Sequence, residues 1–170
     1  MTNKEQVKKV LSFISLLLGA LSLIMIFTPT IKMEALGMSE SISGYEVVFG
    51  KTSGGIGMLK FSFGAFMTFI LALGGGLLAY FGEKNDKIQQ KIIAIVCFFI
   101  ATILFFCMVK LSVIDSEIFQ TELTGMELES AIDLFKGLMK NDAGAILGGI
   151  FCILGVITSS AQVLIDKFID

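Results

Sequence analysis

Four long apolar runs, none of which contains Asp, Glu or Lys, constrain this chain more than any other feature. The runs cover residues 10–27, 61–81, 92–109 and 143–165. A helix rises about 1.5 Å per residue, so each run reaches across roughly 30 Å of hydrocarbon. Because lipid offers no partner to open backbone groups, each run must be helical. The sequence therefore predicts an all-α membrane protein, a four-transmembrane-helix bundle that forms one domain over residues 1–170.

The distribution of lysine predicts the orientation of this bundle. All 13 basic residues are lysines, and six of them fall in two short segments, the N-terminal tail and the loop 82–91. The two long connections, 28–60 and 110–142, carry six lysines over far more chain. The positive-inside rule then places both termini in the cytoplasm and the protein in the cell membrane. The first run also resembles a signal peptide, but no A-x-A-like site follows Phe27, so we favour an uncleaved helix.

The two long connections predict a small extracytoplasmic cap. Apolar and charged residues alternate over 31–35, and Val47 and Phe49 continue such an alternation further along. This pattern favours two short β-like strands that could pair as a hairpin, followed by a flexible return at 52–55. In the second connection, one apolar stripe and a T-x-x-E capping box starting at Thr124 predict an amphipathic helix from Glu127 to Met139. We expect this helix to lie on the bilayer or to cap the bundle.

Residues for catalysis are missing from the sequence. The chain has no histidine and no arginine, and Cys97, Cys107 and Cys152 each sit inside an apolar run without a C-x-x-C pair. We interpret these cysteines as small buried hydrophobes. The acidic segment 122–133 matches no calcium-binding loop and is interpreted as a solvated helix face. We therefore predict no enzyme activity and no catalytic, cofactor-binding or metal residue, and a net charge of −2 argues against nucleic-acid binding.

Small and polar residues within the apolar runs indicate how the helices pack. The steps Ala72-x-x-x-Gly76 and Gly144-x-x-x-Gly148 allow close helix contact, either inside one monomer or laterally with a second copy or another membrane protein. A polar patch near the end of the fourth run favours hydrogen bonds between helices, with a substrate-lining role as the alternative; it comprises Thr158, Ser159, Ser160 and Gln162. We take Lys60 and Lys110 as the ionisable residues closest to the runs. Both lie at span ends, where a lysine side chain can extend its charge towards water.

Two helical hairpins, a longer structured first outer loop and cytoplasmic ends together resemble the claudin-like tetraspan arrangement. The first loop lacks the tryptophan and the disulfide pair of claudins, so the resemblance implies topology alone. The stretch Ser43–Gly50, ahead of a Phe- and Gly-rich helix, is also similar to a pattern in uncharacterised small four-span membrane proteins of low-GC bacteria. That likeness implies no known activity, and no functional residue is carried over.

The sequence thus predicts a non-enzymatic multi-pass integral membrane protein. Small-residue helix faces, a structured cap and the absence of a catalytic set favour a scaffold or accessory subunit that acts by contact. The glycine-rich second and fourth runs and the polar patch at 158–162 leave a small transport or channel component as the alternative. The expected partners are the lipid bilayer and either a second copy of the chain or another membrane protein.

Overall fold

The computed structural model describes residues 3–35, 38–53, 56–59, 61–114 and 139–168. The chain divides into two units. The first, which we name the helical unit, contains Met1–Ile24, Thr68–Ile103 and Gly148–Asp170. The second, the sheet unit, contains Met25–Met67 and Leu104–Leu147.

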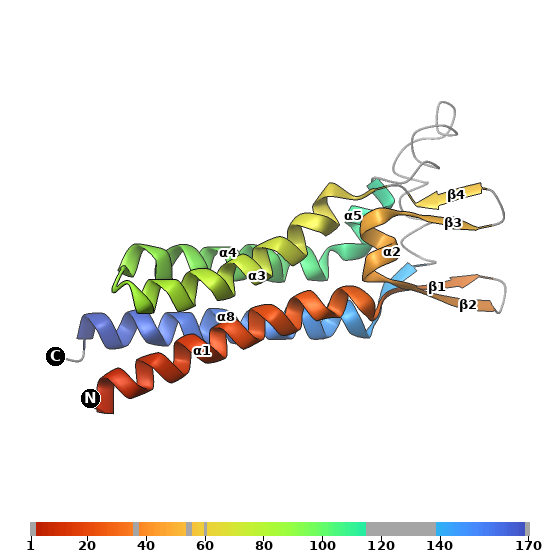
Figure 1. Cartoon of the computed structure of the whole chain (residues 1–170). Helices are drawn as coiled ribbons and strands as arrows, with labels where there is room; N and C mark the ends of the chain where they lie inside the picture. Colours follow the sequence, from red (N-terminus) through yellow and green to blue (C-terminus); the bar gives the residue numbers. More distant parts are fainter. Residues whose placement is uncertain (1–2, 36–37, 54–55, 60, 115–138, 169–170) are drawn as a thin grey trace. The chain divides into compact units, whose positions relative to one another are not determined.

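Four long helices carry the predicted membrane spans. They are α1 (Asn3–Ile24), α3 (Phe63–Lys84), α4 (Ile88–Phe106) and α8 (Ala143–Phe168). Each is long and apolar enough to cross a membrane, α1 together with the 3₁₀ turn η1 (Met25–Phe27) that follows it, which confirms the four predicted spans. In the helical unit these helices lie side by side (Figure 1). All four continue beyond their apolar runs at the lysine-rich end.

In α1 the buried face consists mostly of small and polar residues, and most of the large apolar residues lie on the exposed face. The buried residues of α1 are Ser12, Ser15, Leu18, Gly19 and Ser22. The large apolar side chains on the same helix, such as Phe13, Leu17 and Leu21, are exposed. A water-soluble protein buries its large apolar residues, so the reversed pattern identifies lipid as the surrounding solvent. The chain is a multi-pass membrane protein.

Glycines let α1 and α3 approach each other closely. A Cβ atom added to Gly19 would lie 2.8 Å from the carbonyl oxygen of Ala72 and 3.1 Å from the Cα of Gly76. A Cβ atom on Gly76 would in turn lie 2.9 Å from the carbonyl oxygen of Ser15. The Ala72-x-x-x-Gly76 step therefore packs inside one chain, against Gly19 of the first helix.

Phe98 fills the space that two further glycines leave open. Its ring is fully buried, and it lies against Gly75 of α3 and Gly155 of α8. A Cβ atom on Gly155 would meet the ring at 2.7 Å, and one on Gly75 would meet it at 3.1 Å. One large side chain on α4 thus packs against small residues on two other helices, which is the interdigitation expected of a close-packed interior.

The sheet unit is built around a three-stranded antiparallel sheet in the order β2-β1-β5. The strands are β1 (Pro29–Ala35), β2 (Met38–Ser43) and β5 (Met139–Asn141), and Met33 pairs with Met139. The first strand and its hairpin confirm the prediction for residues 31–35. The amphipathic helix predicted over 127–139 lies outside the described residues except for Met139, where the prediction is wrong because a backbone ladder with β1 holds that residue in a strand.

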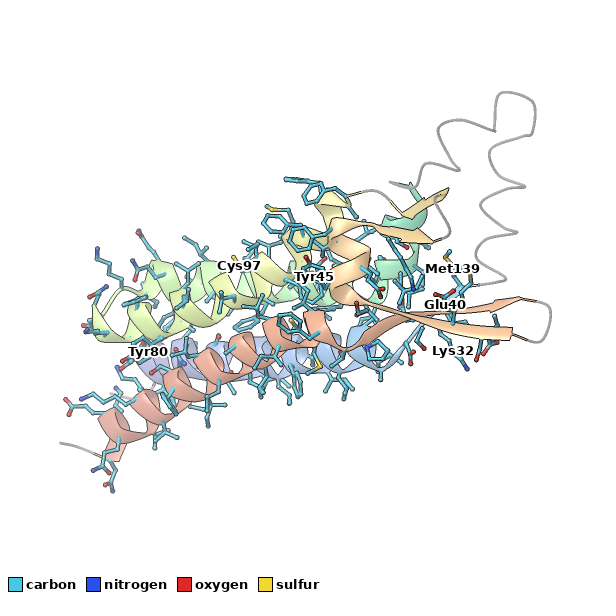
Figure 2. All side chains as sticks on the ribbon, turned by 45° about the vertical axis from the view of Figure 1, so that its right-hand side comes forward. Lys32, Glu40, Tyr45, Tyr80, Cys97 and Met139 are labelled. Atoms are coloured by element: carbon cyan, nitrogen blue, oxygen red, sulfur yellow. The ribbon has the colours of Figure 1, made fainter. Side chains whose placement is uncertain are left out.

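Residues 44–49 form a helix, α2 (Gly44–Phe49), so the strand predicted around Val47 and Phe49 is wrong. A capping box starts this helix: the Ser43 hydroxyl accepts from the Glu46 amide, and the Glu46 carboxylate accepts from the Ser43 amide. These local bonds satisfy the open amides of the first turn, and the side chains of Val47 and Val48 are fully buried. Figure 2 shows Tyr45 on this helix, and Lys32 and Glu40 on the β1–β2 hairpin.

Two further expectations about span and loop boundaries need correction. The predicted return at 52–55 contains part of a second hairpin, in which β3 (Lys51–Ser53) pairs with β4 (Ile56–Leu59). The third span ends at Phe106, not at residue 109, and α5 (Met108–Ile114) follows after a turn at Cys107. The carbonyl oxygen of Phe106 loses its hydrogen bond within the helix because α4 ends there. The Asn141 side chain donates to this oxygen at 2.8 Å and so satisfies it.

Candidate functional site: a charge cluster and a polar seam in the helical unit

Four charged side chains, one from each long helix, meet at one end of the helical unit. They are Lys8 of α1, Glu83 of α3, Lys91 of α4 and Asp166 of α8, and we name them the helix-end cluster. The helices reach this cluster because they extend beyond the apolar runs, α4 beginning at Ile88 and α8 ending at Phe168. In Figure 1 the N-terminal end of α1 and the C-terminal end of α8 lie at the same end of this unit.

The cluster alternates positive and negative groups. Lys91 Nζ lies 2.6 Å from Glu83 Oε2 and 2.5 Å from Asp166 Oδ2. Lys8 Nζ lies 2.6 Å from Asp166 Oδ1 and 3.7 Å from Glu83 Oε1. Each carboxylate thus uses one oxygen for each lysine, and the four formal charges cancel.

Lys91 is the centre of this arrangement. Its side chain has an exposed fraction of 0%, whereas the other three members keep between 11% and 14%. Gly82 makes room for it, since a Cβ atom there would lie 2.9 Å from the Lys91 Cγ. Burial of a lysine is costly unless it is paired and hydrogen-bonded, so the carboxylates that α3 and α8 bring to Lys91 offset the cost of burying its charge.

A seam of neutral polar side chains, comprising Ser15, Thr158, Ser159 and Gln162, adds contacts between α1 and α8 in the same unit. The Ser15 Oγ lies 2.7 Å from the Thr158 Oγ1, and Ser159 Oγ and Gln162 Nε2 each donate to it at 3.4 Å. These bonds confirm the predicted interhelical role of Thr158, Ser159 and Gln162. The Gln162 side chain is fully buried, and its Oε1 has no hydrogen-bond partner among the residues that the structure describes.

Sequence reasoning placed the important charges elsewhere. Lys110, expected to be the ionisable residue nearest a span, is exposed in α5, and Lys60 lies outside the described residues. In the sequence, Lys8 and Lys91 indicate only the orientation of the bundle, although Lys91 comes directly before the third apolar run and Asp166 directly after the fourth. The position of Lys91 and Asp166 beside the apolar runs is the feature from which the cluster could be predicted. A helix of about 20 residues continues from an apolar run into the charged residues next to it without a break.

The cysteines and acidic residues do not assemble into a reactive centre in the part of the chain that the structure describes. The three cysteines, all of which the structure describes, are free. Cys152 is buried as expected, whereas Cys97 and Cys107 are only partly buried, so the prediction is confirmed in part for those two. Among the described residues no group of three or more His, Cys, Asp or Glu side chains could hold a metal ion. The acidic segment 122–133 lies outside the described residues. The expected absence of an enzyme activity stays a prediction.

Comparison with known proteins adds no relative. No family model, no curated protein and no solved structure matches this chain. The claudin-like and bacterial resemblances therefore stay predictions. The four membrane spans are supported by the length and apolar composition of the four long helices.

Proposed function

We propose that this multi-pass membrane protein is not an enzyme but acts by contact, as a scaffold or accessory subunit of a membrane assembly. The observation that carries the proposal is the internal pairing of the helix-end cluster, in which two lysines and two carboxylates neutralise each other. Charges bound to each other in this way hold four helices together at one end. A bundle fixed at its charged end suits a structural role better than a cycle of opening and closing.

Close packing at the glycines supports the same function. The backbones of α1 and α3 meet at Gly19 and Gly76, and Phe98 fills the space beside Gly75 and Gly155. Such contacts leave little freedom for the helices to slide, because each one requires a small residue opposite a fixed partner.

The sheet unit carries exposed aromatic side chains that suit contact with a neighbour. Tyr45, Phe49 and Phe61 are each about half-exposed, and their rings follow one another with centroids 4.8 Å and 6.3 Å apart. Aromatic residues are enriched at the energetic centres of protein interfaces and also at membrane–water boundaries. A crosslinking experiment separates these two uses of the aromatic row.

The test places a photoreactive phenylalanine at Tyr45 and, as the control, at Ile157, an exposed apolar position on α8. After irradiation of native membranes, we expect Tyr45 to crosslink to one defined protein and Ile157 to crosslink mainly to lipid. A freely diffusing monomer, without a protein crosslink from either position, would contradict the proposal.

We further propose that both termini are cytoplasmic and that the connections 28–60 and 110–142 are extracytoplasmic, since lysine is concentrated in the N-terminal tail and in the loop 82–91. In a background with all three cysteines replaced by alanine, an impermeant thiol reagent applied to intact cells should label Ser41→Cys and spare Asn85→Cys, in the turn between α3 and α4. Both positions are exposed in the structure. The reverse pattern of labelling would invert the proposed orientation.

A small transport component is the second candidate, and one observation favours it. Within the described part of the chain, the buried Oε1 of Gln162 in the seam is an acceptor without a donor, and such atoms occur in polar pathways as well as in packed interiors. Flux of ions and small solutes into liposomes that contain the purified protein would decide between the candidates. If the protein conducts a solute and the variant Gln162→Leu abolishes this flux, the transport function is favoured. If no flux is measured at any oligomeric state, the transport function is excluded.

A further inference from the structure

The polar seam between α1 and α8 contains a buried acceptor that the described side chains do not satisfy. The amide of Gln162 is fully buried, and no donor of the described residues reaches its Oε1. A buried amide oxygen without a donor is costly inside a membrane span, where no bulk water replaces the missing hydrogen bond. This atom therefore indicates a ligand that donates a hydrogen bond and is small enough to lie between two packed helices. Every residue of the seam belongs to the helical unit.

Donors and acceptors do not match within the seam. The Ser15 hydroxyl donates to the Leu11 carbonyl at 3.0 Å within α1, so towards α8 it can only accept. Three donors of α8 lie around this one oxygen: Thr158 Oγ1 at 2.7 Å, and Ser159 Oγ and Gln162 Nε2 at 3.4 Å each. A hydroxyl oxygen has two lone pairs, so one of the three donors is in surplus. The seam thus has a surplus donor as well as an unused acceptor.

The bond lengths indicate which donor is in surplus. Ordinary hydrogen bonds between such groups measure about 2.7–3.0 Å, and the Ser15–Thr158 pair falls in that range. The bonds from Ser159 and Gln162 are longer and therefore weak. Ser159 and Gln162 are three positions apart on α8, so they are neighbours on one face of the helix. A ligand at Gln162 Oε1 therefore lies beside the Ser159 hydroxyl.

The seam suits a neutral molecule that both donates and accepts better than it suits a cation. A metal ion uses oxygen atoms as acceptors only, so it would leave the surplus donor unsatisfied. The next charged residue along α8 is Asp166, four positions beyond Gln162, and Lys8 and Lys91 already neutralise it. A cation in the seam would therefore be a buried charge without compensation, which is costly in a membrane span.

We propose that the seam binds one buried water molecule, which donates to Gln162 Oε1 and accepts from the Ser159 hydroxyl. Ser15 then accepts from Thr158 and Gln162 alone, so two donors meet two lone pairs. Buried waters usually make about three hydrogen bonds to polar groups that would otherwise be unsatisfied. This inference goes beyond the proposed contact function. A water fixed in the seam needs no solute pathway, so the inference also holds if no flux is measured.

The first test is a crystal structure of the full-length protein in a lipid phase, at a resolution that shows ordered water. We expect one density peak within hydrogen-bond distance of both Gln162 Oε1 and Ser159 Oγ. The variant Gln162→Met keeps the length of the side chain without its amide, and its structure should lack this peak. A wild-type structure without a peak beside Gln162 Oε1 would overturn the proposal.

The second test measures thermal unfolding in micelles, with Gln89→Met as the matched control because Gln89 is exposed on α4. If a water satisfies the Gln162 amide, Gln162→Met removes satisfied hydrogen bonds and should lower the unfolding temperature by about 4 °C. The control should change it by less than about 2 °C. If Gln162 Oε1 is dry, Gln162→Met removes an unsatisfied buried group, and an unchanged or higher unfolding temperature would contradict the proposal.

Two further measurements complete the test. Replacement of choline chloride by sodium chloride should not change the unfolding temperature of either protein. A rise in sodium that occurs in the wild type and is absent from Gln162→Met would assign the site to a cation and overturn the proposal. If Gln162→Met does not fold by circular dichroism, Ser159→Ala takes its place. It should weaken the density peak and lower the unfolding temperature by about 2 °C, because the water loses one partner, and an unchanged peak would refute the proposed site.

Discussion

Replacement of Lys91 by methionine should destabilise the helical unit more than the loss of any exposed lysine. Methionine keeps the length and apolar stem of the side chain, so the change removes the charge and leaves the packing beside Gly82 nearly unaltered. The two carboxylates that contact Lys91 at 2.6 Å and 2.5 Å would then share Lys8 alone. One buried negative charge would lack a partner.

The expected cost follows from burial and from the number of partners lost. Removal of one member of a buried ion pair costs about 3–5 kcal/mol, and Lys91 is fully buried with two close carboxylates, so the upper half of that range applies. Lys8→Met should cost less, about 2 kcal/mol, because Lys8 retains some exposure and lies 3.7 Å from one of the two carboxylates. The double variant Lys91→Met with Glu83→Gln restores neutrality and should recover at least half of the loss.

The assay is reversible unfolding in mixed micelles, followed by circular dichroism, with Lys87→Met as the control for an exposed lysine of the same turn region. The control should change the free energy of unfolding by less than about 0.5 kcal/mol. The reasoning is refuted if Lys91→Met costs no more than the control. It is also refuted if the neutral double variant is less stable than Lys91→Met, because the cost would then come from lost packing and not from an unpaired charge.

Three further outcomes follow from the structure. Gly76→Val should cost about 1–3 kcal/mol in the micelle assay, because its Cβ would lie 2.9 Å from a carbonyl oxygen of α1, whereas Gly74→Ala meets nothing within 4 Å and should be neutral or stabilising. The Ser43 amide that caps α2 donates to the Glu46 carboxylate and lowers the pKa of Glu46. The charged carboxylate therefore stabilises the fold above the ordinary carboxyl pKa, and this stabilisation is lost as pH falls through the pKa that Glu46 has in the folded protein. The variant Glu46→Gln should remove this acid dependence of thermal unfolding. Ser15→Ala should cost about 1–2 kcal/mol, measured against Ser160→Ala, because three side chains of α8 share its hydroxyl.

Some local structure was readable from the sequence and some was overlooked. Alternation over residues 31–35 predicted β1 correctly, because a period of two survives wherever one face of a strand is buried. The capping box of Ser43 and Glu46 is an equally local signal, but the alternation of Val47 and Phe49 after it predicts a strand, and the structure has the helix α2 there. The pairing of Met139 with Met33 could not be predicted, because a three-residue strand has no pattern of its own and forms only when β1 is present beside it.

Hydropathy alone decided the solvent and the number of spans, since four uncharged runs of this length are stable only as helices in lipid. Tertiary structure decided what those helices do with one another. The partners of Lys91 come from two other helices, one of them 75 positions away along the chain, and Gly19 finds its contact on α3. The physical reason is that transfer from water to lipid is a property of each segment by itself, whereas the energy of a buried charge or a glycine contact depends on which side chain another helix brings opposite it.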